Sequence, residues 1–289
     1  YDNMNVWIIS IATLLMAMVG FVDDYLKIVK KLSKGLIARY KLICQVLVGS
    51  FIAFMVLNYT QNPIIFIDSS QDSIKSISNT STSLPFIMNG FMEIPKAFYV
   101  LLVVIVITAT SNSVNLTDGL DGLATGLSAI SILTMGAIAY ASGRSDFSDY
   151  LNILYIKGAD ELLIFSFAAI GACLGFLWYN SHPASIFMGD TGSLALGTAL
   201  GTLAVLLKKE ILLIIIGGVF VIESLSVIIQ VLYFKYTKNK YGLGKKIFLM
   251  APIHHHFEEK GLSESKVVIR FWIIGILLAL FSLSSFKLQ

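Results

Sequence analysis

Apolar runs about as long as a membrane span recur along nearly the whole chain, and they limit its fold more than any other feature. The runs lie near residues 4–22, 42–59, 97–114, 120–141, 161–179, 191–207, 211–234 and 267–286. A helix needs about 20 apolar residues to cross a bilayer, where its backbone polar groups must be satisfied within the helix. We therefore predict an all-α polytopic integral membrane protein with eight transmembrane helices, forming a single membrane-embedded domain over residues 1–289.

The composition agrees with a membrane protein, because 56% of the residues are hydrophobic and only 13% are charged. Soluble domains carry about 25% charged residues. The net charge of +3 is too small to indicate a nucleic-acid partner. Cys44 and Cys173 both lie inside apolar runs, which gives no sign of a disulfide framework. The first run lacks a basic leader and a small-residue cleavage site, so we interpret it as a span and not as a signal peptide.

The connections between the runs predict how the helices are joined. The third and fourth runs, and the sixth and seventh, are separated by only a few residues, which predicts two tight helical hairpins. Residues 60–96 include Pro63 and Pro85 and are a candidate for a short hairpin outside the membrane. Residues 235–266 are expected to form the largest cytoplasmic loop. The run at 191–207 is the weaker span, since it is rich in Gly and Thr.

Lysine and arginine residues indicate the orientation. If the segment after the first run is cytoplasmic, that side carries 14 of these residues and the other side carries 7. Cytoplasmic loops of membrane proteins are enriched in Lys and Arg. The same alternation places four polar clusters on the cytoplasmic side: Asp23-Asp24 with Lys27, 112–121, 189–193 and 254–256. Carboxylates near hydrocarbon are costly unless hydrated, paired or bound to a cation, so their convergence indicates an enzyme that handles phosphate and a divalent metal.

The first cluster ends the first run. Asp23 and Lys27 share a helical face. Asp23 and Asp24 point about 100° apart, so these two carboxylates can both face one cleft only at its mouth. Adjacent carboxylates repel unless a cation or a shared proton stabilises them. The alternative is an ordinary interfacial helix end. Lys30, Lys31 and Lys34 equally fit the role of membrane-surface anchors, which we favour for Lys34.

The second cluster has a regular pattern. Amide and carboxylate residues recur at every third position: Asn112, Asn115, Asp118 and Asp121. This spacing would line one helical face, while Gly119 and Gly122 would allow backbone to approach a ligand and would unwind the helix locally. A polar turn between two spans explains Asp and Gly but not the regular pattern.

The third cluster, Gly189–Ser193, opens the sixth run. Asp190 or Ser193 would cap the helix, and its exposed amides would favour an anion. Upstream, Asn180 and His182 are either ligand contacts or interfacial polar residues, and we favour the interfacial interpretation for His182.

The fourth cluster consists of three consecutive histidines, His254, His255 and His256. They cannot share a helical face, and their spacing matches no standard zinc motif. We favour a pocket wall that donates imidazole hydrogen bonds to phosphate over a metal site. Glu223 lies within an apolar run and so is a functional candidate, although the sequence reveals no partner for it.

The strings at 23–27, 112–124, 187–193 and 250–258 together resemble the polyprenyl-phosphate N-acetylhexosamine-1-phosphate transferases, in the right order and over nearly the whole chain. That family typically has ten spans. The resemblance therefore implies a ten-helix fold of which this sequence lacks the first two helices. The string at 251–258 is most similar to the branch with a muramoyl-pentapeptide donor.

This resemblance implies a reaction at a bacterial inner membrane. Phospho-N-acetylmuramoyl-pentapeptide would pass from its UDP carrier, UDP-N-acetylmuramoyl-pentapeptide, to the membrane lipid undecaprenyl phosphate, giving lipid I and UMP. Mg²⁺ is the implied cofactor, with Asp190 as its ligand. Asp23 would deprotonate or orient the lipid phosphate, supported by Asp24 and Asp118. The implied substrate-binding residues are Lys27, Lys31, Asn112, Asn115, Gly119, Asp121, Asn180, Phe187, His254, His255 and His256.

Two other functions fit part of the pattern. A cation- or proton-coupled transporter would also carry intramembrane carboxylates, but near the middle of the membrane on broken helices. A sibling transferase that uses UDP-N-acetylglucosamine is the closer alternative, and the triple histidine argues against it. The sequence leaves the oligomeric state open, with a homodimer as one alternative.

Overall fold

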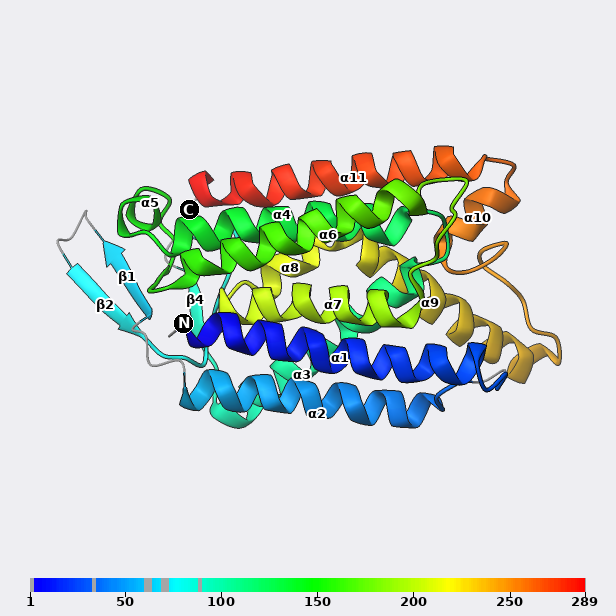
Figure 1. Ribbon diagram of the computed structural model, residues 1–289, viewed down its shortest axis with the longest axis horizontal. Helices are drawn as coiled ribbons and strands as arrows, with labels where there is room; N and C mark the ends of the chain where they lie inside the picture. Colours follow the sequence, from blue (N-terminus) through cyan, green and yellow to red (C-terminus); the bar gives the residue numbers. More distant parts are fainter. Residues whose placement is uncertain (1–2, 33–34, 60–63, 69–72, 88–89, 289) are drawn as a thin grey trace.

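The computed structural model describes residues 3–32, 35–59, 64–68, 73–87 and 90–288 (Figure 1). Its α-helices are α1 (Met4–Ile28), α2 (Ala38–Asn58), α3 (Lys96–Thr117), α4 (Leu123–Ser142), α5 (Ser145–Tyr150), α6 (Leu162–Asn180), α7 (Gly189–Leu206), α8 (Glu210–Ile216), α9 (Gly218–Tyr241), α10 (Ile253–Glu259) and α11 (Glu264–Ser284). Among the described residues, seven helices are long and apolar enough to cross a membrane: α1, α2, α3, α4, α6, α9 and α11. The prediction of a helical multi-pass membrane protein is confirmed.

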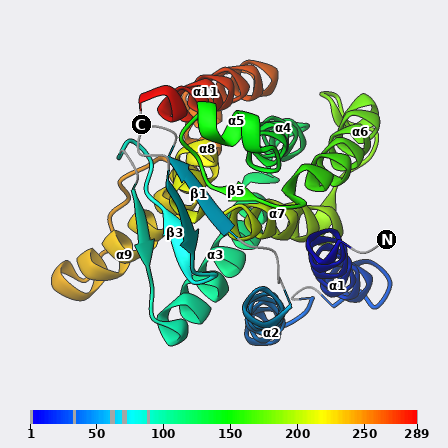
Figure 2. The same cartoon turned by 90° about the vertical axis from the view of Figure 1, so that its left-hand side faces the viewer.

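The sixth expected span, 191–207, corresponds to α7 and is not among the seven candidate membrane helices. Figure 2, viewed from the end that carries the strands, shows α7 lying among α1, α3 and α4, and α7 packs on all three. Nearly every residue from Ser193 to Leu206 is buried. Because α7 is enclosed by protein, it needs no lipid-facing apolar surface, which explains how a helix rich in Gly and Thr lies at the centre of the bundle.

Two details of the predicted connections are wrong. The run at 211–234 is not one helix, because α8 ends at Ile216 and α9 begins at Gly218, and a pair of glycines at 217–218 is a common cause of such a break. The third and fourth expected spans are joined by a short turn, but they do not pack as a tight hairpin. Helix α3 packs chiefly on α7 and α2, whereas α4 packs chiefly on α6 and α11.

Five short strands lie at one end of the bundle: β1 (Ile64–Asp68), β2 (Ser73–Ile77), β3 (Ser81–Ser83), β4 (Phe91–Glu93) and β5 (Tyr155–Ile156). They form two antiparallel sheets, in the orders β2-β1-β5 and β3-β4, and Ile64 pairs with both Ile77 and Ile156. The hairpin predicted within residues 60–96 is therefore confirmed, although Pro63 lies outside the described residues. The fold is not purely helical at this end.

The polar clusters of the sequence converge at the opposite end (Figure 1). Helices α1, α3, α6 and α9 run toward that end, so the segments that follow them lie together there. The segment 235–266 contains the last turns of α9, all of α10 and the start of α11. Both ends of the chain lie at the strand end.

Glycines set how closely α7 approaches its neighbours. A Cβ atom on Gly20 of α1 would lie 2.2 Å from the backbone oxygen of Asp190. A Cβ atom on Gly197 of α7 would lie 2.6 Å from the Cα atom of Ser111 on α3. Real Cβ atoms do not approach other atoms so closely, so these contacts require glycine. The resulting close packing brings the ends of α1 and α3 against the start of α7.

The Gly197→Ala substitution tests this packing. The added methyl group should force α3 and α7 apart, at a cost of about 1–3 kcal/mol for overpacking, which exceeds the ~1 kcal/mol that alanine gains in helix propensity. We expect a lower Tm for the detergent-purified protein. Gly171→Ala on α6 is the matched control, because nothing lies within 4 Å of its added Cβ atom, and its Tm should be unchanged or higher. Equal Tm values for the two variants would contradict the close approach.

Candidate active site

The last turn of α1 is joined to the first turn of α7 by a carboxylate. Asp24 accepts hydrogen bonds from the backbone N–H groups of Asp190 (3.1 Å) and Thr191 (2.9 Å) and from the Thr191 hydroxyl (2.6 Å). The prediction that Asp190 or Ser193 caps this helix is wrong, since the Ser193 hydroxyl donates to the Gly189 carbonyl oxygen instead. The free amides and positive dipole at the start of α7 are satisfied by an anion from another helix.

Asp190 is thereby free to face a pair of lysines. Its Oδ2 atom accepts from Lys27 Nζ (3.1 Å) and Lys41 Nζ (2.5 Å), and its Oδ1 atom accepts from Asn115 Nδ2 (2.7 Å). The same two lysines pair with Asp23, with Lys41 Nζ at 3.3 Å. Asp23 is fully buried and also accepts from the backbone N–H of Leu36 (2.6 Å). Two carboxylates and two ammonium groups from three helices therefore form one network.

Lys41 is a site residue that the sequence analysis did not identify. The sequence shows it only as one of 14 positive charges on the presumed cytoplasmic side. Its position at the start of α2 brings it to Asp190, which is 149 residues away in the chain. Lys31, by contrast, is a substrate-binding residue implied by the resemblance, and in the structure it is exposed. The described ion pairs of Asp23 and Asp190 involve Lys27 and Lys41 only.

The donor set of this network suits a magnesium ion. Oxygen atoms of Asp23, Asp24 and Asp190 all lie within 4.8 Å of one another. Mg²⁺ prefers oxygen ligands and usually binds one or two carboxylates together with substrate phosphates. Asp23 and Asp190 are held by lysines, whose ammonium groups would also attract phosphate. These residues fit a Mg²⁺ ion together with a phosphorylated substrate.

A polar cavity of about 490 Å³ opens beside this network, between α1, α2 and α3. Its lining includes Asp23, Lys41, Gln45 and Asn112, and Asn112 donates to Gln45 Oε1 at 2.9 Å. A second cavity, of about 440 Å³, shares Leu42 and Asn112 with the first and is lined mostly by apolar side chains of α2, α3 and α9. The two together form a groove that is polar at the site and apolar along the bundle.

The regular polar pattern on α3 ends earlier than predicted. Helix α3 ends at Thr117. Asn115 donates to Asp190 in the network and Asn112 lines the adjoining cavity, but Asp118 and Asp121 lie beyond the helix. Burial, together with the nearby carboxylates of Asp190 and Asp24, raises the pKa of Asp118 to about 7. The predicted local unwinding at the glycine-containing turn is confirmed, and it ends the polar helical face before Asp118, so the face does not extend to Asp121.

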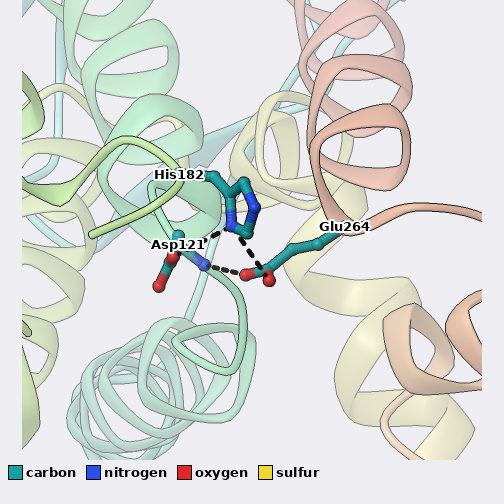
Figure 3. Close-up of side chains that lie close together, drawn as sticks. All are labelled: Asp121, His182 and Glu264. Carbon is teal, nitrogen blue, oxygen red and sulfur yellow. Dashed lines mark hydrogen bonds and ion pairs between the residues drawn. The ribbon is translucent and has the colours of Figure 1, made fainter.

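Asp121 faces a different set of partners (Figure 3). Its Oδ2 atom accepts from the backbone N–H of Ala184 (2.9 Å) and lies 3.2 Å from His182 Nδ1. Its own backbone N–H donates to Glu264 Oε1 (2.7 Å). His182, for which the sequence favoured a simple interfacial position, therefore lies between two carboxylates, since Glu264 Oε2 is also 3.2 Å from its Nδ1 atom.

Asn180 and Phe187 flank the loop that leads into α7. Asn180 is buried, accepts from the Gly122 N–H (3.1 Å) and donates to the Ile186 carbonyl oxygen (2.9 Å). Its amide thus holds two backbone segments together. Phe187 is 75% exposed at the same end of the bundle, where its ring is available to a ligand.

The three histidines have three different partners, as their positions on a helix require. His254 Nδ1 lies 3.0 Å from Glu223 Oε2, His255 Nδ1 lies 2.7 Å from Glu258 Oε2, and His256 Nδ1 accepts from the Leu249 N–H (3.1 Å). His254 and Glu223 are both fully buried. The structure thus supplies the partner of Glu223 that the sequence did not reveal.

Gly119 provides the space for His254. A Cβ atom on Gly119 would lie 2.4 Å from the His254 Nε2 atom and 3.4 Å from the His255 Nε2 atom. The second and fourth polar clusters of the sequence therefore meet at this glycine.

The fold and this site define a membrane-embedded transferase. Residues 6–208 match the family model of glycosyl transferase family 4, and the chain belongs to that family. Its relatives carry a more particular name, phospho-N-acetylmuramoyl-pentapeptide-transferase.

The chain is 49% identical to the protein of that name from Chlorobium limicola over 289 residues, which is 100% of this chain and 75% of the relative. It is 50% identical to that of Chlorobium chlorochromatii over 288 residues, 100% of this chain and 74% of the relative. It is 51% identical to that of Chloroherpeton thalassium over 284 residues, 98% of this chain and 73% of the relative.

The raised pKa of Asp118 predicts a pH-dependent stability. The folded protein favours the protonated carboxyl, so this contribution is complete below the ordinary pKa of 3.8 and is lost as the pH rises from there to about 7. Asp118→Asn keeps a neutral side chain at every pH. The Tm of the wild type relative to this variant should therefore fall between about pH 4 and pH 7 and level off above that range, as measured by thermal unfolding. A constant difference across that range would show that Asp118 does not titrate there.

The buried Glu223–His254 pair predicts a strong energetic coupling. Glu223→Leu or His254→Leu alone leaves a buried partner without its hydrogen bond, at a cost of about 1–3 kcal/mol. The double variant removes both groups, so its loss of Tm should be smaller than the sum of the single losses. Glu223→Leu combined with His255→Leu is the control and should be additive, because His255 pairs with Glu258. Additivity in both cycles would contradict the pairing.

Proposed function

We propose that the chain transfers phospho-N-acetylmuramoyl-pentapeptide from its UDP-linked donor to undecaprenyl phosphate, giving lipid I and UMP in the first membrane step of peptidoglycan synthesis. The observation that carries this proposal is the groove that joins the Asp23, Asp190 and lysine network to an apolar cavity. The identity of the donor follows from the shared name of the relatives.

The groove fits a lipid phosphate acceptor. Its apolar portion, lined by side chains such as Val46, Val104 and Ile228, would bury part of a polyprenyl chain. Its polar portion contains Lys27 and Lys41, whose ammonium groups would hold the phosphate head. A phosphate in this position would lie next to the buried carboxylate of Asp23.

The donor would bind on the other side of Asp190. Phe187 offers an exposed ring for stacking with the uracil base, and Asp118, Gly119 and His255 lie near the turn after α3. His255 offers an imidazole to the diphosphate. In this arrangement the two substrates meet at the start of α7, whose dipole favours negative charge.

The chemistry requires positioning and charge compensation. A phosphate oxygen of the lipid forms a new bond to the donor phosphorus that bears the sugar, and the bond to the other donor phosphate breaks, releasing UMP. Asp23 orients the attacking phosphate or accepts its proton, and Lys27 and Lys41 offset the charge of the reacting phosphates. Asp24 holds the first turn of α7, which keeps Asp190 directed into the site.

Mg²⁺ would be held by Asp190, with Asp23 and Asp24 close by. When bound, it would neutralise charge on the donor diphosphate. The cytoplasmic location of the site is supported by the 14 to 7 distribution of Lys and Arg residues and by the soluble nature of a UDP-linked donor.

The proposal is tested by UMP release in detergent from the donor, undecaprenyl phosphate and Mg²⁺. The wild type should release UMP, and Asp190→Asn should reduce kcat by at least ~10²-fold, since an amide is a poor Mg²⁺ ligand. Asp146→Asn is the matched control, because Asp146 is exposed at the strand end, and it should keep full activity. UMP release from UDP-N-acetylglucosamine instead would identify a sibling transferase and overturn the proposed donor.

The same assay tests the side of the membrane. Inverted membrane vesicles expose the cytoplasmic face and should release UMP from added donor, whereas intact spheroplasts should not. Equal activity of added donor with intact spheroplasts would place the site outside.

A further inference from the structure

We propose that Asp121, His182 and Glu264 form a second divalent-metal site, for a transition-metal ion such as Zn²⁺ or Mn²⁺, separate from the Asp23, Asp24 and Asp190 group. The three residues come from the turn between α3 and α4, the loop between α6 and α7, and the first turn of α11 (Figure 3). The proposal concerns metal binding, and it does not depend on which reaction the chain catalyses.

The spacing of the donor atoms fits one ion. His182 Nδ1 lies 3.2 Å from Asp121 Oδ2 and 3.2 Å from Glu264 Oε2, and the three ligand atoms all lie within 4.8 Å of one another. Around an ion with bonds of about 2.0–2.2 Å, neighbouring ligand atoms are separated by roughly 2.8–3.6 Å. The side chains can therefore enclose an ion with small movements.

The charge balance of this group calls for a cation. The ion pairs described for Asp121 and Glu264 involve His182 alone, whereas Asp23 and Asp190 share two lysines. A neutral His182 leaves two carboxylates close together without a compensating charge, which is unfavourable. A divalent ion on all three groups would compensate both charges.

Backbone groups already orient the carboxylates. Asp121 Oδ2 accepts from the Ala184 N–H, and Glu264 Oε1 accepts from the Asp121 N–H. Outer-sphere hydrogen bonds of this kind fix ligand orientation in metalloproteins. The side chains are 18%, 25% and 43% exposed for Asp121, Glu264 and His182, so an ion reaches them from solvent.

The ligand types indicate which ion binds. One imidazole with two carboxylates suits Zn²⁺, Mn²⁺ or Fe²⁺, whereas Mg²⁺ prefers oxygen ligands alone. Three protein ligands leave at least one coordination position for water or a substrate group. A bound ion would tie together three segments, one of which carries Phe187 and leads to Asp190. We expect it to stiffen the donor side of the site.

The experiment is a titration of the untagged, detergent-purified chain with Co²⁺ as a spectroscopic probe and Zn²⁺ as a competitor. We expect one equivalent of Co²⁺ to give a visible absorption band that Zn²⁺ removes, together with a higher Tm. His182→Ala and Glu264→Gln should each weaken the Co²⁺ affinity at least ~10-fold. Glu264→Gln retains an oxygen that accepts from the Asp121 N–H, so a Tm near that of the wild type without metal shows that its fold is intact.

Matched controls separate this site from the other metal-binding groups. Asp190→Asn, which removes the expected Mg²⁺ ligand, and His256→Ala, which removes a histidine of α10, should both retain Co²⁺ binding. The proposal is overturned if no saturable Co²⁺ band forms, or if binding is lost in His256→Ala but kept in His182→Ala. Because the readout is direct binding, a failure to release UMP leaves this result unaffected, and the two proposals fail independently.

Discussion

The site depends on one contact, in which a carboxylate at the end of one helix accepts the free amides at the start of another. Asp24 on α1 accepts from the first N–H groups of α7, and Gly20 lets the two backbones come close enough for this. Because Asp24 satisfies the helix terminus, Asp190 is left to face Lys27 and Lys41. Asp24 thus orders the start of α7, while Asp23 and Asp190 hold the two lysines.

Charge compensation differs between the two ends of the bundle. At the candidate active site, lysines and carboxylates border an open cavity of about 490 Å³, so these charged groups are accessible to a ligand. At the strand end, Lys208 donates to Tyr99 (2.8 Å) and Thr82 donates to Glu210 (2.6 Å), and all four residues are buried. The side chains of this second group are buried and hydrogen-bond to one another, which fits a structural role. The difference lies in access and not in the types of residue.

Much of the fold could be predicted because the bilayer imposes a strong constraint on helix length. The long spans, their alternation and the hairpin near residue 64 all follow from apolar runs and turn residues. Helix packing could not be predicted in the same way. The approach of α3 to α7 depends on Gly197 meeting Ser111, and no local pattern reveals that two positions 86 residues apart share a contact.

The sequence by itself determined the class of the protein, the residue types of the site and the end of the bundle where they gather, because hydropathy and the alternation of spans are properties of the chain read in order. Only the tertiary structure decided the pairings. It brought Lys41 to Asp190, gave His254 to Glu223, and placed Asp121 beside His182 and Glu264. Each of these contacts joins distant segments, and its geometry is fixed by how the helices pack and not by the spacing of residues along any one of them.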